Sequence, residues 1–162
     1  MIRLTGNLAR DERGTSIVEM ALMMPFLATF VIGMSDLARA YSTKLQLEQA
    51  AYRAIERVQQ YQSTQATYLL LKNEAVAAAN DAGFTDVTAS NVTVNWWLEC
   101  NGVVQSNYDA GCSGSQVQAR WINVDVVKTF TPRFTPISFN RWMGSNADGT
   151  FTLHGKAGLR TQ

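Results

Sequence analysis

The sequence predicts an α+β fold: a long N-terminal helix, a second antiparallel helix and a small antiparallel β-sheet. Three observations support this fold class. One apolar run near the N-terminus is long enough to cross a membrane, residues 35–60 contain neither glycine nor proline, and the later half of the chain alternates apolar and polar residues. Helices followed by strands, rather than interleaved with them, are typical of α+β domains.

The apolar run extends from Ile17 to Met34 and contains one charged residue, Glu19. A bilayer core of about 30 Å requires roughly 20 apolar residues in a helix. Counting from Thr15 gives 20 residues. We therefore expect residues 15–34 to form a transmembrane or assembly segment, and residues 35–162 to form an exported α+β domain.

The helical pattern continues beyond the apolar run. A helix from Thr15 to about Gln60 would be on the order of 70 Å long at 1.5 Å per residue. Its second half is amphipathic, because apolar side chains recur at three- or four-residue steps. This stripe consists of Leu37, Tyr41, Leu45, Tyr52 and Ile55, with Glu48 in the series, and is widened by Ala40, Leu47, Ala51, Ala54 and Val58.

A second helix is predicted from about Thr64 to Ala82. Ser63 or Thr64 would cap its start, and Gly83 suits the left-handed position that follows a helix. It should pack antiparallel on the amphipathic half of the first helix. One face carries Tyr68, Leu71, Ala75, Ala78 and Ala82.

Strand-like alternation follows Gly83. Residues 91–100 place Val92, Val94, Trp96 and Leu98 on one face, and residues 117–130 are rich in β-branched side chains. Residues 151–160 alternate again, with Phe151, Leu153, Ala157 and Leu159 on one face. These three runs predict an antiparallel sheet with a long connection, residues 132–149, before the last strand.

The two cysteines, Cys100 and Cys112, both follow the apolar run. An even number of cysteines in an exported domain favours a disulfide. Closing this loop would contribute about 3 kcal/mol in the chain-entropy model. Such a bond would join the end of one strand to the loop before the next, and the alternative is two free thiols.

Residues 1–14 are polar, carry Arg3, Arg10 and Arg13, and end in glycine. We interpret them as a leader peptide or a cytoplasmic tail, because basic residues beside a span favour the cytoplasmic side. In a secretory signal peptide the small-residue cleavage site follows the apolar core. Here the glycine precedes the core.

Glu19 lies inside the apolar run, where a charged carboxylate costs roughly 2.5–3.5 kcal/mol on insertion scales. Cleavage after Gly14 would give Thr15 a free amino group and make Glu19 the fifth residue of the mature chain. In a helical assembly that amino group can pair with Glu19 of a neighbouring subunit. The alternative is a tolerated polar residue near the membrane boundary.

This junction resembles that of type IV pilins, and more closely that of the TadE-like pseudopilins of tight-adherence (Tad/Flp) pili. The resemblance covers about residues 10–55, and Met20 departs mildly from the aromatic residue found in many relatives. The matching positions are Arg13, Gly14, Val18, Glu19, Pro25, Asp36, Arg39, Gln49, Ala50 and Ala51.

The resemblance implies cleavage between Gly14 and Thr15 by a prepilin peptidase, and a role in the assembly of an adhesive pilus. It also implies other pseudopilins, the major pilin and an inner-membrane assembly platform as partners. The chain would cross the inner membrane once, with its N-terminus cytoplasmic and its C-terminal domain periplasmic.

Other functions have little support in the sequence. A net charge of +1 argues against a nucleic-acid-binding surface. His154 is the only histidine and has no catalytic motif beside it, and no zinc-like spacing of ligands is present. We therefore expect no catalytic residue, cofactor or metal site. Of the four tryptophans, Trp96, Trp97, Trp121 and Trp142, we expect Trp96 and one other to pack in the core, rather than the four to form a ligand platform.

Three alternatives remain. The chain could be an uncleaved single-pass membrane protein whose exported domain is a binding module. It could be an exported enzyme with a pocket of converging polar groups. It could also be a TadF-like pseudopilin of the same system.

Overall fold

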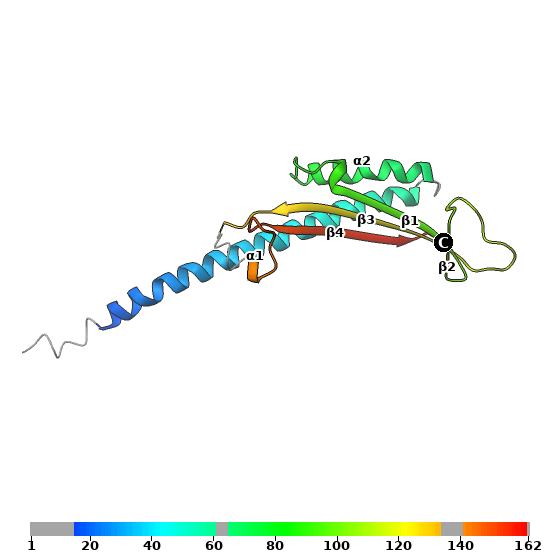
Figure 1. The fold of residues 1–162 in the computed structure, drawn as a ribbon. Helices are drawn as coiled ribbons and strands as arrows, with labels where there is room; N and C mark the ends of the chain where they lie inside the picture. The colour runs from blue at the N-terminus through cyan, green and yellow to red at the C-terminus, as the bar shows by residue number, and fades with distance from the viewer. Residues whose placement is uncertain (1–14, 61–64, 134–140, 162) are drawn as a thin grey trace, which may run out of the picture.

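The computed structural model describes residues 15–60, 65–133 and 141–161, and confirms the predicted α+β fold (Figure 1). A long helix extends from the domain, and a second helix packs beside its distal half. The elements are α1 (Thr15–Gln60), α2 (Gln65–Asp81), a short 3-10 helix (Ala89–Asn91), β1 (Val92–Cys100), β2 (Val103–Gln105), β3 (Gln118–Phe130) and β4 (Phe151–Arg160).

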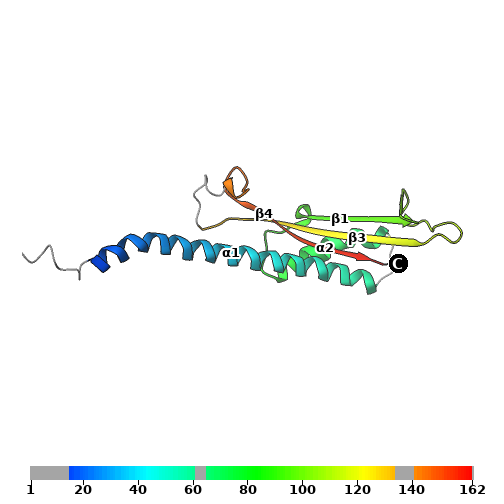
Figure 2. The same cartoon turned by 90° about the horizontal axis from the view of Figure 1, so that it is seen from below.

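The four strands form one antiparallel sheet in the order β2-β1-β3-β4. Helix α1 packs on β3 and β4, whereas α2 packs on β1 and on α1. The strands run along the distal half of α1 (Figure 2). The domain therefore has two layers, with both helices on the same face of the sheet.

The core lies between these layers. Helix α1 contributes Leu47, Ala51 and Ala54, which are fully buried, and α2 contributes Tyr68 and Leu71. Alanines on α1 allow the helix to approach the sheet closely. The strands fill the other side of the core with branched side chains, namely Val92, Leu98, Ile122, Val124 and Val126.

The closest approach between helix and sheet is at Gly155 in β4. A Cβ atom at this position would overlap the backbone of Leu47 and Glu48 in α1. Only glycine leaves room for this contact, because every other residue carries that atom. Gly155 therefore fixes how deeply α1 sits on the sheet.

The end of α2 follows the prediction. Gly83 has a φ of +94°, the left-handed conformation expected after a helix. Its N–H donates to the carbonyl of Asn80 and that of Phe84 donates to Ala79, which is the Schellman pattern. The predicted face is buried except Ala82, which is half-buried, and the predicted caps Ser63 and Thr64 lie outside the described residues.

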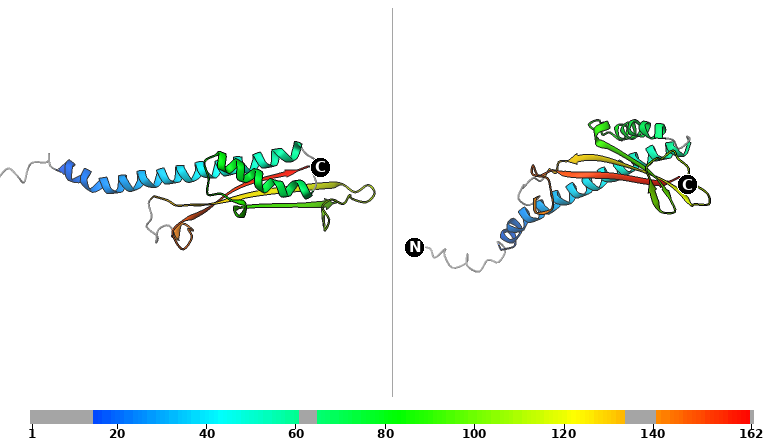
Figure 3. Two further views of the ribbon diagram at one scale, coloured as in Figure 1. Left: turned by 90° about the horizontal axis from the view of Figure 1, so that it is seen from above. Right: turned by 45° about the vertical axis from the view of Figure 1, so that its right-hand side comes forward.

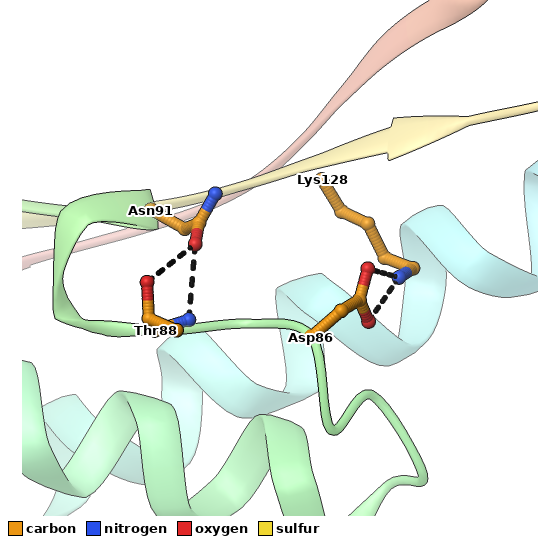
Figure 4. Close-up of polar contacts among 4 residues, drawn as sticks. All are labelled: Asp86, Thr88, Asn91 and Lys128. Atoms are coloured by element: carbon orange, nitrogen blue, oxygen red, sulfur yellow. Dashed lines mark hydrogen bonds and ion pairs between the residues drawn. The ribbon is translucent and has the colours of Figure 1, made fainter.

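Polar contacts fasten the connection from α2 to β1 (Figure 4). The side-chain oxygen of Asn91 accepts hydrogen bonds from the backbone N–H and hydroxyl of Thr88, at 3.0 and 2.9 Å. Asp86 forms an ion pair with Lys128 of β3. The Lys128 ammonium donates hydrogen bonds to the Asp86 carboxylate and thereby lowers the pKa of that carboxyl.

Strand β2 is an element that the sequence analysis placed in a loop. Asn101 and Gly102 have φ values of 50° and 80° and form a two-residue turn between β1 and β2. Positive φ at both positions is typical of the type I′ hairpin turn. The connection between β1 and β3 is thus a short hairpin followed by a loop, residues 106–117.

We expect Gly155→Ala to lower the free energy of unfolding by about 2–3 kcal/mol, since overpacking at a tight contact typically costs this much. Gly111→Ala is the matched control, because a Cβ atom there meets nothing within 4 Å. Urea unfolding of the full chain in detergent measures both. Equal stability of the two variants would show that α1 does not approach β4 this closely.

Candidate functional site

The N-terminal part of α1, residues 15–34, extends away from the domain and is called here the apolar half (Figure 1). This helix contains a stretch long and apolar enough to cross a membrane. Its large apolar side chains between Ile17 and Met34 are 43–73% exposed. Such a surface is unfavourable in water and suits lipid or other apolar helices.

Pro25 does not end the helix, since α1 continues through it as one element from Thr15 to Gln60. Proline lacks an N–H group and normally weakens the preceding turn. The Thr29 hydroxyl donates a hydrogen bond to the Pro25 carbonyl at 2.7 Å. Thr29 carries the only hydroxyl near the middle of the apolar half. This bond satisfies that hydroxyl within the helix itself, so it needs no partner from another element.

A paired charge marks the end of the apolar half. Asp36 is only 7% exposed and accepts a hydrogen bond from the Arg39 guanidinium at 3.1 Å. The guanidinium also lies over the Phe130 ring, 5.5 Å from its centroid. Asp36 and Arg39 therefore pair, as their spacing allowed, and they tie α1 to the end of β3.

The distal half of α1 has three distinct faces. One packs on the domain through Leu47, Ala51 and Ala54. A second is polar and carries Gln46, Gln49 and Arg53. The third, called here the exposed stripe, is apolar and uncovered by any described part of the chain. It consists of Tyr41, Leu45 and Tyr52, which are 40–61% exposed.

The exposed stripe refines the sequence analysis, which assigned these residues and the buried ones to a single apolar stripe. Leu47, Ala51, Ala54 and Ile55 are buried as an amphipathic helix requires. The exposed stripe is rotated from them around the helix, where neither α2 nor the sheet reaches. Three large apolar side chains exposed on one helix face are typical of an interaction surface.

Glu19 belongs to the same side of α1 as the exposed stripe. It precedes Tyr41 by 22 residues, which is close to six turns at 3.6 residues per turn. The Glu19 side chain is exposed. One partner lying along this side of α1 would therefore meet the Glu19 carboxylate, the rest of the apolar half and the exposed stripe in succession.

The predicted cleavage site falls at the start of the described residues. Gly14 lies outside them, and Thr15 is the first residue of α1. Glu19 follows Thr15 by four residues, one helical turn along the same helix. Thr15 and Glu19 thus both belong to α1.

The predicted disulfide between Cys100 and Cys112 is present, with 5.6 Å between the Cα atoms. It holds the loop of residues 106–117 against the distal end of β1. The same loop buries Tyr108, whose hydroxyl is hydrogen-bonded to that of Tyr68 in α2. The Arg120 guanidinium lies 5.5 Å from the centroid of the Tyr108 ring.

The tryptophans occupy different environments. Trp96 packs beside the Tyr68 ring, with 5.7 Å between centroids. Trp97 and Trp121 stack on the outer face of the sheet at 6.1 Å, and both indole N–H groups donate to the Glu99 carboxylate, at 2.8 and 3.1 Å. Trp142 is 83% exposed.

His154 faces outward from β4 as expected, but the fold brings it to Asp125 of β3, at 3.0 Å. Lys156 lies 3.8 Å from the same carboxylate. Sequence alone gave no sign of this group, because it depends on strand register. Within the described residues, no group of three or more His, Cys, Asp or Glu side chains is placed to hold a metal ion.

Comparison with known families gives one match. Residues 14–55 match the family described as TadE-like protein, which confirms the resemblance drawn from the sequence. The matched segment contains the predicted cleavage site, the apolar half of α1 and the exposed stripe, and it ends before α2 and the sheet. No curated protein and no solved structure matches the chain.

We expect replacement of both cysteines by serine to lower the free energy of unfolding by about 3 kcal/mol, because the disulfide restricts the unfolded chain. Urea unfolding of the full chain measures this loss. Peptide mapping without reductant should also recover Cys100 and Cys112 as one linked pair. Alkylation of both thiols in the untreated protein would contradict the prediction.

Proposed function

Because residues 14–55 match the TadE-like family, we propose that this chain is a pseudopilin, or minor pilin, that takes part in assembling a Tad-type adhesive pilus. The observation that carries the proposal is the uncovered side of α1. An apolar half, a carboxylate and the exposed stripe follow one another along a single helix, within the segment that the family match covers.

In this proposal a prepilin peptidase cuts the chain after Gly14. The new amino group of Thr15 then carries a positive charge at the N-terminus of α1. The Glu19 carboxylate of a neighbouring subunit neutralises it, and each charge relieves the cost of burying the other. The pair also sets the stagger between two subunits, because the charged groups meet at only one relative height.

The exposed stripe extends this contact beyond the membrane. Tyr41 lies two turns past the apolar half, and Tyr52 lies about three turns farther along. A helix of another pseudopilin or of the major pilin can pack along this side in the parallel manner of helical bundles. The sheet domain is on a different side of α1 and does not obstruct such a partner.

We place the chain in the inner membrane, with residues 1–14 on the cytoplasmic side and the sheet domain in the periplasm, next to the assembly platform. Arg3, Arg10 and Arg13 precede the span and support this orientation. The disulfide also suits an oxidising compartment. We propose that the chain acts by assembly and not as an enzyme.

The competing proposal is an uncleaved single-pass protein whose sheet domain binds a partner. Its outer sheet face, with Trp97 and Trp121, would be the binding surface. The two proposals differ in what they require of the N-terminus and of Glu19. Only the pseudopilin needs a cut after Gly14 and a carboxylate at position 19.

Co-expression with a prepilin peptidase of a Tad system should reduce the intact mass of the chain by the mass of residues 1–14. The expected product begins at Thr15. Omission of the peptidase is the control, and in that sample the chain should keep these residues. Identical masses in the two samples would exclude processing and favour the uncleaved membrane protein.

Disruption of the uncovered side of α1 should prevent association with other pilins. Tyr41→Lys should weaken recovery of the chain with its partners about tenfold, since burial of such a side chain contributes about 1.5–3 kcal/mol. Glu19→Ala should also weaken it, because the partner's amino group is left without a counter-charge. Co-purification from detergent-solubilised membranes measures both effects.

Ser42→Lys is the matched control for Tyr41→Lys. Ser42 is the next residue and is also exposed, but it belongs to the polar face of α1. The same charge is thus introduced at nearly the same height without entering the exposed stripe. Equal loss of partners in both lysine variants, or full recovery of Glu19→Ala, would contradict assembly through this side.

A further inference from the structure

The end of the sheet beside the apolar half of α1 carries an apolar cavity of about 260 Å³. Gly33 and Leu37 line it from the helix, and Phe130 and Phe151 line it from the ends of β3 and β4. Met143, from the segment between the two strands, completes it. The segment before β4 lies at this end of the sheet in every view (Figures 1 and 3).

The position of this cavity relative to a bilayer follows from α1. The apolar half ends at Met34, and Asp36 and Arg39 are the first charged residues after it. A span of about 20 residues fills the hydrocarbon core, so Gly33 lies at its outer boundary. Because Met143 lines the same cavity as Gly33, it lies at about the same height.

Two large apolar side chains are exposed at this height. Trp142 is 83% exposed, and its chain neighbour Met143, which lines the apolar cavity, is 55% exposed. Tryptophan is enriched where the headgroups of a bilayer meet its acyl chains, because its ring is apolar and its N–H is polar. Burial of these side chains in lipid would remove apolar surface from water.

The charges around them fit a lipid headgroup. Arg39, Arg133 and Arg141 are exposed at this end of the domain, and guanidinium groups bind phosphate in a bidentate manner. Of the nearby carboxylates, Asp36 is buried and paired with Arg39. Asp148 is exposed in the turn before β4 and accepts a hydrogen bond from the Thr150 hydroxyl at 2.7 Å.

We propose that this end of the domain is a second membrane contact. Trp142 and Met143 enter the headgroup–acyl boundary of the bilayer that α1 crosses, and the Arg133 and Arg141 side chains bind lipid phosphates. The contact holds the sheet domain in one orientation on the membrane before assembly. It rests on the membrane span of α1 and requires neither cleavage after Gly14 nor a pilin partner.

The distribution of tryptophans allows a direct test. Trp121 precedes Phe130 by nine residues of strand, about 30 Å at 3.3 Å per residue, and Trp97 pairs with Trp121 in the sheet. Trp96 adjoins Trp97, so three tryptophans lie at the distal end and Trp142 alone lies at the membrane end. Bromine atoms on lipid acyl chains quench only tryptophans that they contact.

The full chain is reconstituted at low density in vesicles of phosphatidylethanolamine and phosphatidylglycerol with brominated acyl chains. We expect partial quenching of the wild-type fluorescence relative to unbrominated vesicles. This quenching should be lost in Trp142→Phe and retained in Trp97→Phe, the matched control. Because Trp142 is exposed, its replacement leaves the core unchanged.

Two results would overturn the proposal. Equal fluorescence in brominated and unbrominated vesicles, with Trp142 quenched by acrylamide from the water, would place this end of the domain clear of the bilayer. In the second result, Trp142 is protected from both quenchers, and this protection is lost when the protein is diluted further in the membrane. That result would show that a second copy of the chain, instead of lipid, covers the surface.

Discussion

The contact between α1 and β4 at Gly155 determines which sides of the long helix remain available. Because the backbone of Leu47 and Glu48 sits directly against this glycine, α1 has a fixed rotation and depth on the sheet. Its alanine-rich face is then buried, and the side that carries Tyr41 and Leu45 is left uncovered. A side chain at position 155 would change both the depth and the rotation.

That rotation extends to the far end of the helix, because α1 is continuous from Thr15 to Gln60. Glu19 and Tyr41 are about six turns apart, so the packing of the domain also sets the direction in which the Glu19 carboxylate points. The Arg39–Asp36 pair and the Phe130 ring brace the helix where it leaves the domain. The domain thus orients the apolar half of α1, although the large apolar side chains of that half remain exposed.

Much of this architecture could be predicted because its signals are local. Gly83 after an apolar helix, alternation along β1 and two cysteines flanking a loop each depend on a few neighbouring residues. The three main strands accordingly fall within one residue of their predicted bounds. The family resemblance likewise rests on a contiguous segment, residues 14–55.

Other features depend on contacts between distant segments, and the sequence could not supply them. Periodicity shows that Tyr41 and Leu47 are both apolar positions of a helix, but not that the sheet covers only Leu47. The contact of His154 with Asp125 requires the β3–β4 register. Strand β2 has three residues, too few for an alternating pattern, although Asn101-Gly102 is a recognised hairpin signal.

The uncovered side of α1 also indicates where the free energy of an assembly would come from. In the proposed function, residues 15–34 lie in lipid before assembly, and exchanging lipid for another helix gains little hydrophobic free energy because both are apolar. The exposed stripe is different, since Tyr41, Leu45 and Tyr52 are exposed in the single chain. Their burial removes apolar surface from water at about 25 cal/mol per Å².

The charge at Glu19 is different for another reason. A carboxylate in lipid is costly until it finds a counter-charge, and the relief of that cost favours association at one height only. Affinity would therefore come chiefly from the exposed stripe outside the membrane, and register from Glu19 inside it. The apolar half that contains Glu19 would supply the length needed to cross the bilayer. A single helix would then both anchor the subunit in the membrane and bind its neighbour.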